Sequence, residues 1–182
     1  MKWNAIQQTA YGSYGIITFA QAKGLGVFPA ELYRWCRGGR LMKVGRGVFR
    51  LTSYPSQGFV SDMAALLALV GEGAYLCGES VLALYDLCPT RSYVATVAVS
   101  GRFRKRQMPN GVTVVKATAG YNPAYHDGIP CQRPADAIRF CIGRLERSRL
   151  KQAVDEAENK GIFTSSEADE LKKEVESVKA TA

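Results

Sequence analysis

The chain has 182 residues, of which 47% are hydrophobic, and a net charge of +8 from 24 basic and 16 acidic residues. This composition is typical of a soluble globular protein with one large or two small domains, and it excludes a disordered chain. The five cysteines lack the spacing of a disulfide scaffold or a zinc finger, and a single histidine excludes a His-rich metal site. We therefore expect reduced thiols, no metal and no cofactor.

The apolar segments are too short for a membrane protein. The richest of them, residues 63–70, falls far short of the roughly 20 residues that a membrane helix needs. The N-terminal residues have no apolar core of the kind found in signal peptides. We therefore expect a cytoplasmic protein with no membrane partner.

The positive charge is concentrated near the N-terminus. Residues 1–52 contain eight basic residues and one acidic residue, whereas residues 129–182 contain ten of each. A small module with such an imbalance repels itself unless it meets a polyanion, and DNA is the commonest polyanion in a cell. Solubility alone is the alternative explanation, which the concentration of charge in one segment disfavours.

The N-terminal segment predicts three short helices followed by a hairpin. The apolar spacing predicts a helix over residues 3–10, and a short extended piece follows at 15–17. Thr18 can cap a helix that ends near Gly24, and Pro29 suits the first turn of a third helix that runs to about Arg37. Residues 41–51 read as a hairpin around Gly45-Arg46-Gly47. This order of elements predicts a winged helix-turn-helix over residues 1–52.

A polar stretch at residues 52–58 is the expected domain boundary, and a second domain is expected over residues 59–178. Its predicted helices cover residues 58–70, 79–87, 134–145, 147–159 and 165–178. Its predicted strands cover residues 74–77, 93–99 and 112–116, and residues 120–130 read as a loop. The expected fold class is α+β, with an N-terminal winged helix-turn-helix followed by a mixed α+β domain.

The third helix has the features of a recognition helix. Leu32, Trp35 and Cys36 have the spacing of a buried side. Arg34 and Arg37 then face outward one turn apart, where each can pair with guanine or clamp a phosphate. Two roles also stay open for Tyr33, which can contact DNA or pack partly into the core.

Other cations in this segment are candidates for contact with the DNA backbone. Arg40 and Lys43 follow the third helix and are expected to meet phosphates, and Arg46 at the hairpin tip suits the minor groove or the backbone. Arg50 can point either way from its strand. Lys23 can touch the backbone or only balance its helix dipole. If about five cations neutralise phosphates, log affinity falls with log salt at a slope of roughly −4 to −5.

These residues resemble the abortive-infection AbiE-type antitoxins over about residues 12–52. The segments that carry the resemblance are Ile17-Thr18, Ala22–Val27, Leu32-Tyr33-Arg34, Gly39-Arg40-Leu41 and Val44–Leu51. A weaker similarity continues at Gly78–Leu87, Gly128-Ile129-Pro130 and Pro134–Ile138. These antitoxins are transcriptional regulators of bacterial type IV toxin–antitoxin pairs.

The resemblance implies two functions. The winged helix would bind inverted repeats of double-stranded DNA in its own promoter and repress that operon, with two copies reading half-sites about 34 Å apart. The C-terminal domain would counter a nucleotidyltransferase-like toxin, without an obligatory stable complex. Two alternatives stay open. One is a regulator without a toxin partner, and the other is a winged-helix module for another nucleic acid or a protein.

No constellation of residues indicates an enzyme. Glu79, Asp86 and Asp127 are scattered, and no serine lies in the setting of a nucleophile elbow. A second basic patch remains, which is either a binding surface or a solvated hairpin tip. Its residues are Arg102, Arg104, Lys105 and Arg106, and Phe103 among them is a group on which a base could stack.

Overall fold

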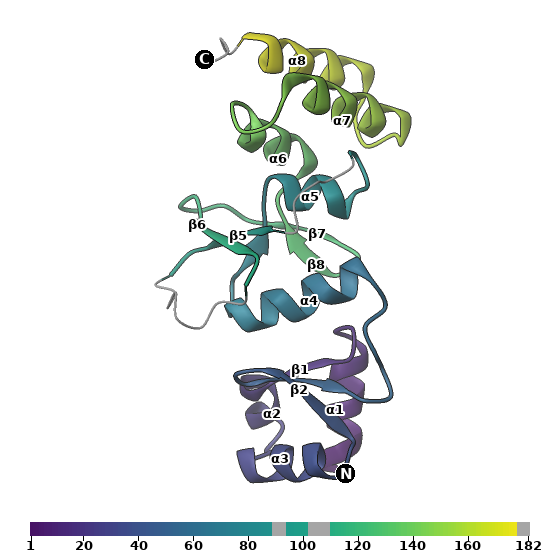
Figure 1. The fold of residues 1–182 in the computed structure, drawn as a ribbon, viewed down its shortest axis with the longest axis vertical. Coiled ribbons are helices and arrows are strands. Elements are labelled where there is room, and N and C mark those ends of the chain that lie inside the picture. Colours follow the sequence, from purple (N-terminus) through teal and green to yellow (C-terminus); the bar gives the residue numbers. More distant parts are fainter. Residues whose placement is uncertain (89–93, 102–109, 178–182) are drawn as a thin grey trace. The chain divides into compact units, whose positions relative to one another are not determined.

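The computed structural model describes residues 1–88, 94–101 and 110–177 (Figure 1). The chain forms two compact units. The first contains Met1–Ala74, and the second contains Tyr75–Gly101 and the residues from Gly111 onward. Helices occur with two β-sheets, which confirms the α+β class.

The first unit contains four helices and one sheet among its described residues. The elements are α1 (Lys2–Tyr11), β1 (Ile16–Thr18), α2 (Phe19–Gly24), α3 (Pro29–Arg37), β2 (Leu41–Gly45), β3 (Val48–Leu51) and α4 (Phe59–Val70). The predicted order of three helices and a hairpin is thus confirmed. The three strands form an antiparallel sheet in the order β1-β3-β2, so the short extended piece becomes its third strand.

Local signals set the ends of α2 and α3. Thr18 accepts a hydrogen bond from the backbone N–H of Gln21, and the Gln21 side chain accepts one from the backbone N–H of Thr18. This reciprocal pair is a capping box, and it satisfies N–H groups at the start of α2. Gly26 has φ +71°, a left-handed conformation that suits the turn into α3.

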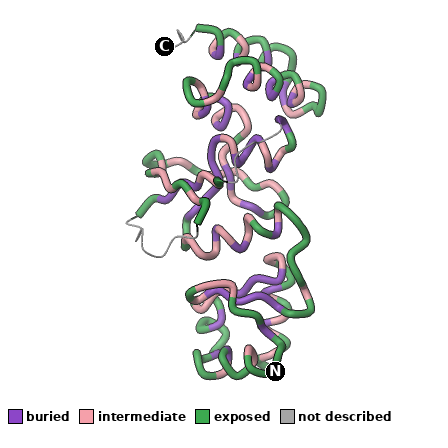
Figure 2. The backbone as a smooth tube through the Cα atoms, in the orientation of Figure 1, coloured by how far each residue is buried: buried purple, intermediate pink, exposed green. Residues whose placement is uncertain are grey.

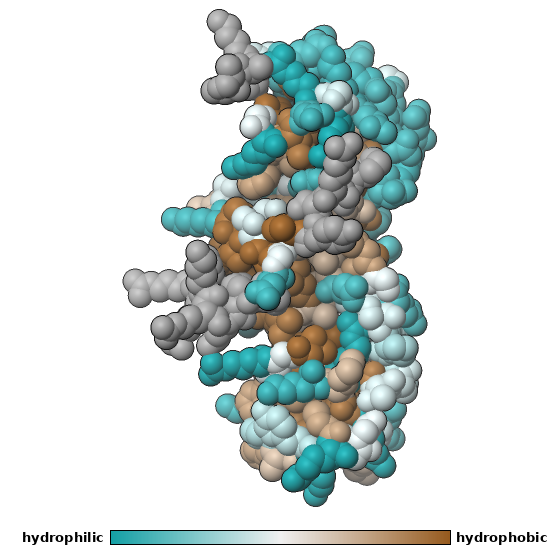
Figure 3. All heavy atoms as spheres, in the orientation of Figure 1, coloured by the Kyte–Doolittle hydropathy of each residue, from teal (hydrophilic) through white to brown (hydrophobic). Residues whose placement is uncertain are grey.

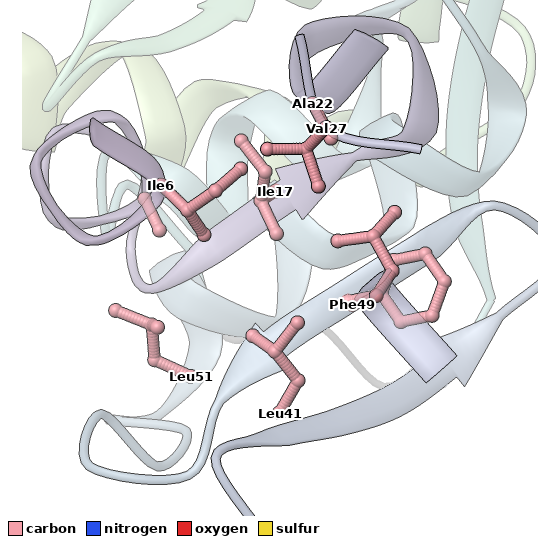
Figure 4. Close-up of a cluster of buried hydrophobic side chains, with 9 residues drawn as sticks. Ile6, Ile17, Ala22, Val27, Leu41, Phe49 and Leu51 are labelled. Carbon is pink, nitrogen blue, oxygen red and sulfur yellow. The ribbon is translucent and has the colours of Figure 1, made fainter. Parts of the chain in front are cut away.

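The core of this unit lies between the helices and one face of the sheet. Ile6, Ile17, Leu32, Phe49 and Leu51 are each at most 1% exposed and belong to one cluster. Figure 4 shows side chains from α1, β1, α2, β2 and β3 that point toward one another. Since successive strand residues alternate between the two faces, the strand residues that alternate with this cluster point to the opposite face of the sheet.

Helix α4 covers that opposite face. Ala65, Ala68 and Leu69 of α4 pack against Ile16 and Val48. Strand β3 is therefore buried along its whole length, as Figure 2 shows. The first unit includes α4 for this reason, although the sequence pattern placed this helix at the start of the second domain.

The second unit has a mixed sheet and four helices among its described residues. The strands are β4 (Tyr75–Leu76), β5 (Ala95–Val99), β6 (Val112–Lys116), β7 (Ala124–His126) and β8 (Ile129–Cys131). The helices are α5 (Glu79–Leu84), α6 (Pro134–Cys141), α7 (Arg147–Asn159) and α8 (Ser165–Ser177). The strand order is β6-β5-β4-β8-β7, with β6 parallel to β5 and β8 parallel to β4. Helix α6 contacts α5, α7 and α8.

The differences from the sequence prediction in this unit include one predicted loop and the ends of two helices. The predicted loop at residues 120–130 contains a hairpin of β7 and β8, whose two-residue turn is Asp127-Gly128 with positive φ at both positions. Helix α6 ends at Cys141 because Ile142 is extended and Gly143 has φ +77°. Helix α5 ends at Leu84, shortly before Asp86 in the left-handed region.

Each helix in residues 1–88 and 110–177 is too short or too polar to cross a lipid bilayer.

All five cysteines are free thiols, and Cys77, Cys88, Cys131 and Cys141 are buried. Burial raises the pKa of Cys77 and Cys141 to about 12, because a thiolate loses its hydration in an apolar interior.

Candidate nucleic-acid interface

Helix α3 turns one side into the core and leaves the other exposed. Leu32 is fully buried, and Trp35 and Cys36 pack against the same cluster. The exposed residues in the second half of the helix are Tyr33, Arg34 and Arg37. The expected division of this helix is therefore confirmed, and Figure 2 shows its outer side as exposed.

The start of α3 is held by the only acidic residue of the first 52 residues. The Glu31 carboxylate accepts a hydrogen bond of 3.0 Å from the backbone N–H of Phe28, and it pairs with the Lys2 ammonium at 3.1 Å. These two contacts, with the backbone bond as the larger cause, lower the pKa of Glu31. The one carboxylate of this segment is thus engaged by Phe28 and Lys2 at the N-terminal end of α3.

Tyr33 has a mixed position. The residue is 48% exposed, yet its ring meets the buried Phe49 ring edge-on at 6.0 Å between centroids. The Lys43 ammonium lies 5.9 Å from the Tyr33 ring centroid. Tyr33 therefore links α3 to the hairpin and brings one predicted cation beside the helix.

Arg40 is positioned by an aromatic group. Its guanidinium lies 5.3 Å from the Trp3 ring, which in turn packs edge-on against Trp35 at 5.0 Å. A cation over an aromatic face is attracted to it and loses some of its freedom. Arg40 remains exposed, so its outer edge can still reach an anion.

The hairpin places cations at the two ends of β2. Arg40 precedes the strand and Arg46 follows it, which separates their α-carbons by about 20 Å at the rise of a β-strand. Gly47 has φ +71° in the turn, and its carbonyl accepts a 2.7 Å hydrogen bond from the backbone N–H of Phe19. The hairpin tip is therefore tied to the start of α2.

The predicted cations of this surface are all exposed. They are Arg34, Arg37, Arg40, Lys43 and Arg46, and within the described residues none forms an ion pair with a carboxylate. Figure 3 shows hydrophilic side chains that project from the first unit. Exposed cations without internal counterions favour an external anion as partner.

Arg50 points the other way. It is 3% exposed, and its guanidinium donates to the Ser61 hydroxyl at 2.7 Å and to the Ser61 carbonyl at 3.1 Å. Of the two directions left open for its side chain, the structure selects the interior, and Arg50 is not part of the exposed surface. Ser61 was not among the residues predicted from the sequence. Its one distinguishing sequence feature is that it is a polar residue in the first turn of an apolar helix.

The other candidate carboxylates make separate contacts. Glu79 pairs with Arg149 at 3.2 Å, Asp86 with Lys160 at 3.3 Å, and Asp127 occupies the β7–β8 turn. The residues that the structure describes include no cluster of three or more metal-ligating side chains. The second basic patch, Arg102, Arg104, Lys105 and Arg106, lies outside the described residues.

The sequence of the first unit is similar to a known protein family. Residues 4–52 match the family model described as the transcriptional regulator, AbiEi antitoxin. This match confirms the resemblance inferred from the sequence, over the three helices and the hairpin. No curated protein matches the chain.

Proposed function

We propose that the first unit is a winged helix-turn-helix that binds duplex DNA in the promoter of its own operon and represses transcription. Helix α3 would be the recognition helix, and β2 and β3 would form the wing. The observation that carries this proposal is the set of exposed cations on α3 and the hairpin, whose only acidic neighbour in the first 52 residues is engaged by Lys2 and Phe28.

The dimensions agree with this role. Nine residues of α3 extend about 13 Å, which fits a major groove about 12 Å wide. Arg34 and Arg37 would contact bases or phosphates there, with Tyr33 beside them. The DNA backbone on either side of the groove would be contacted by Arg40, Lys43 and Arg46, since Arg40 and Arg46 are separated by the length of β2.

The second unit would serve as the antitoxin half and not as an enzyme. The match to an antitoxin family lies at residues 4–52 of the first unit, so the role of the second unit is carried over from the weaker resemblance at Gly78–Leu87 and Pro134–Ile138. Glu79 and Asp86 are held in separate ion pairs there. Its functional partner would be a nucleotidyltransferase-like toxin that a neighbouring gene encodes. Both proteins would act in the cytoplasm, without an obligatory stable complex. Co-expression with the product of such a neighbouring gene should restore growth, and turnover that Glu79→Gln, Asp86→Asn or Asp127→Asn abolishes would contradict this view.

A gel-shift titration with the upstream region of the gene tests the DNA-binding proposal. We expect preferred binding to a duplex that contains an inverted repeat, two copies per repeat, and a slope of log affinity against log salt of roughly −4 to −5. A scrambled duplex and an RNA hairpin of equal length are the competitors. Equal or better binding to the RNA would favour the alternative of another nucleic-acid target, and no binding to either would favour a protein partner.

A further inference from the structure

Arg50 and Ser61 attach the predicted wing to α4 at one end of that helix. A guanidinium that is 3% exposed must have its hydrogen bonds satisfied within the protein, because it has lost most of its contact with water. Ser61 satisfies two of its donors, through its hydroxyl and its backbone carbonyl. These charge-assisted bonds join the middle of β3 to the first turn of α4.

Leu69 attaches the wing at the other end of α4. Gly45 lies directly against the Leu69 side chain, and a Cβ added to Gly45 would force the Leu69 Cδ2 atom to shift. Gly45 is not among the glycines with positive φ, so its backbone conformation would also accept another residue. Val44 and Val48 pack in the same cluster as Leu69, one on each strand of the hairpin.

We propose that α4 is the positioning element of the wing, and that Ser61 and Leu69 hold the hairpin so that Arg46 reaches DNA. Gly45 directly precedes Arg46, so a shift at the Leu69 contact moves the neighbouring cation. The two contacts lie on successive strands and at opposite ends of α4, which restrains both translation and rotation of the hairpin. This inference rests on the proposed function of the first unit.

Gly45→Val, alone and together with a compensating change at Leu69, tests the contact between these residues. Gly45→Val should lower affinity for the operator about as much as Arg46→Ala does, roughly 3- to 10-fold, and should reduce the salt slope by about 1. Adding Leu69→Ala removes three carbons where valine adds three, and it should restore affinity and slope. Gly101→Val is the control, because a Cβ there would meet no atom of the described residues within 4 Å. Wild-type affinity and slope in Gly45→Val would overturn the inference.

A measurement without DNA separates this inference from the proposed function. In Ser61→Ala, the amides of residues 42–49 should exchange with solvent several-fold faster than in the wild type, while the amides of α1 keep their rates. Unchanged exchange in the hairpin would overturn the inference even if the protein binds DNA. Faster exchange in a protein that binds no duplex would leave α4 as the support of the hairpin and refute only its DNA-binding role.

Discussion

The ring of Tyr33 meets the ring of Phe49 edge-on at 6.0 Å, and Phe49 is 1% exposed. The two rings join the outer side of α3 to the middle strand of the sheet. Tyr33 thus contributes to folding through this ring contact, and its exposed part is available for binding.

Substitutions at Tyr33 should separate these contributions. Tyr33→Phe keeps the ring and should leave the free energy of unfolding within about 0.5 kcal/mol of the wild type. Tyr33→Ala should cost about 1–2 kcal/mol because the edge-on contact and part of its buried area are lost. Urea denaturation measures the first effect, and DNA affinity of Tyr33→Phe measures the hydroxyl's share of binding. Equal stability of all three proteins would contradict the packing role.

Charge reversal on α3 should abolish binding without unfolding the protein. In the double variant Arg34→Glu/Arg37→Glu, operator affinity should fall about 100-fold or more, because two attractive contacts become repulsive. Both side chains are exposed, so the circular dichroism spectrum should remain that of the wild type. Lys173→Glu reverses a cation on α8 and should bind nearly as the wild type. Normal repression by the double variant would refute α3 as the recognition helix.

The cap of α3 should make stability depend on pH. The lowered pKa of Glu31 means that the unfolded chain binds its proton more readily than the folded one. Its stabilising contribution is therefore present at neutral pH and is lost as pH falls through the folded-state pKa of Glu31. The urea midpoint of Glu31→Gln should lie below that of the wild type at pH 7, and the two should converge as pH falls below the folded-state pKa of Glu31.

A second variant divides the causes of this shift. Lys2→Ala removes the ion pair but leaves the bond from the Phe28 backbone, so its urea midpoint at pH 7 should lie between those of the wild type and Glu31→Gln. A constant difference between wild type and Glu31→Gln at all pH values would show that the carboxylate charge contributes nothing.

The buried thiols should be inert in the folded protein. With the pKa of Cys77 and Cys141 raised to about 12 by burial, both side chains stay protonated at pH 8, and the thiolate is the reactive form. Reaction with Ellman's reagent should therefore be slow until urea unfolds the chain, when all five thiols react. Cys36 is only partly buried and should account for the first phase, which Cys36→Ser removes. Rapid reaction of several thiols in native protein would contradict the burial.

Much of the first unit follows from local sequence. The bounds of α3 are those predicted, because Pro29 suits a first helical turn and Gly38-Gly39 ends the helix. The hairpin follows from apolar strands around Gly45-Arg46-Gly47, and α2 follows from the cap at Thr18. These signals act between residues close in the chain. The concentration of positive charge is likewise a property of composition alone.

The hairpin of β7 and β8 shows where local signals were present but insufficient. Asp127-Gly128 is a typical two-residue turn, yet the strands on either side have only three residues each. Such short strands are stable only when a neighbour pairs with them, and β4 supplies that pairing to β8. The sequence pattern alone therefore predicted a loop for this segment.

The direction of Arg50 and the place of α4 were decided only by tertiary structure. A strand residue can face either side of its sheet, and an apolar helix can cover any apolar face, so neither sequence pattern names a partner. The partner of Arg50 is 11 residues away, across the linker expected to separate two domains. Burial energy depends on which surfaces meet, and that is a property of the folded chain as a whole.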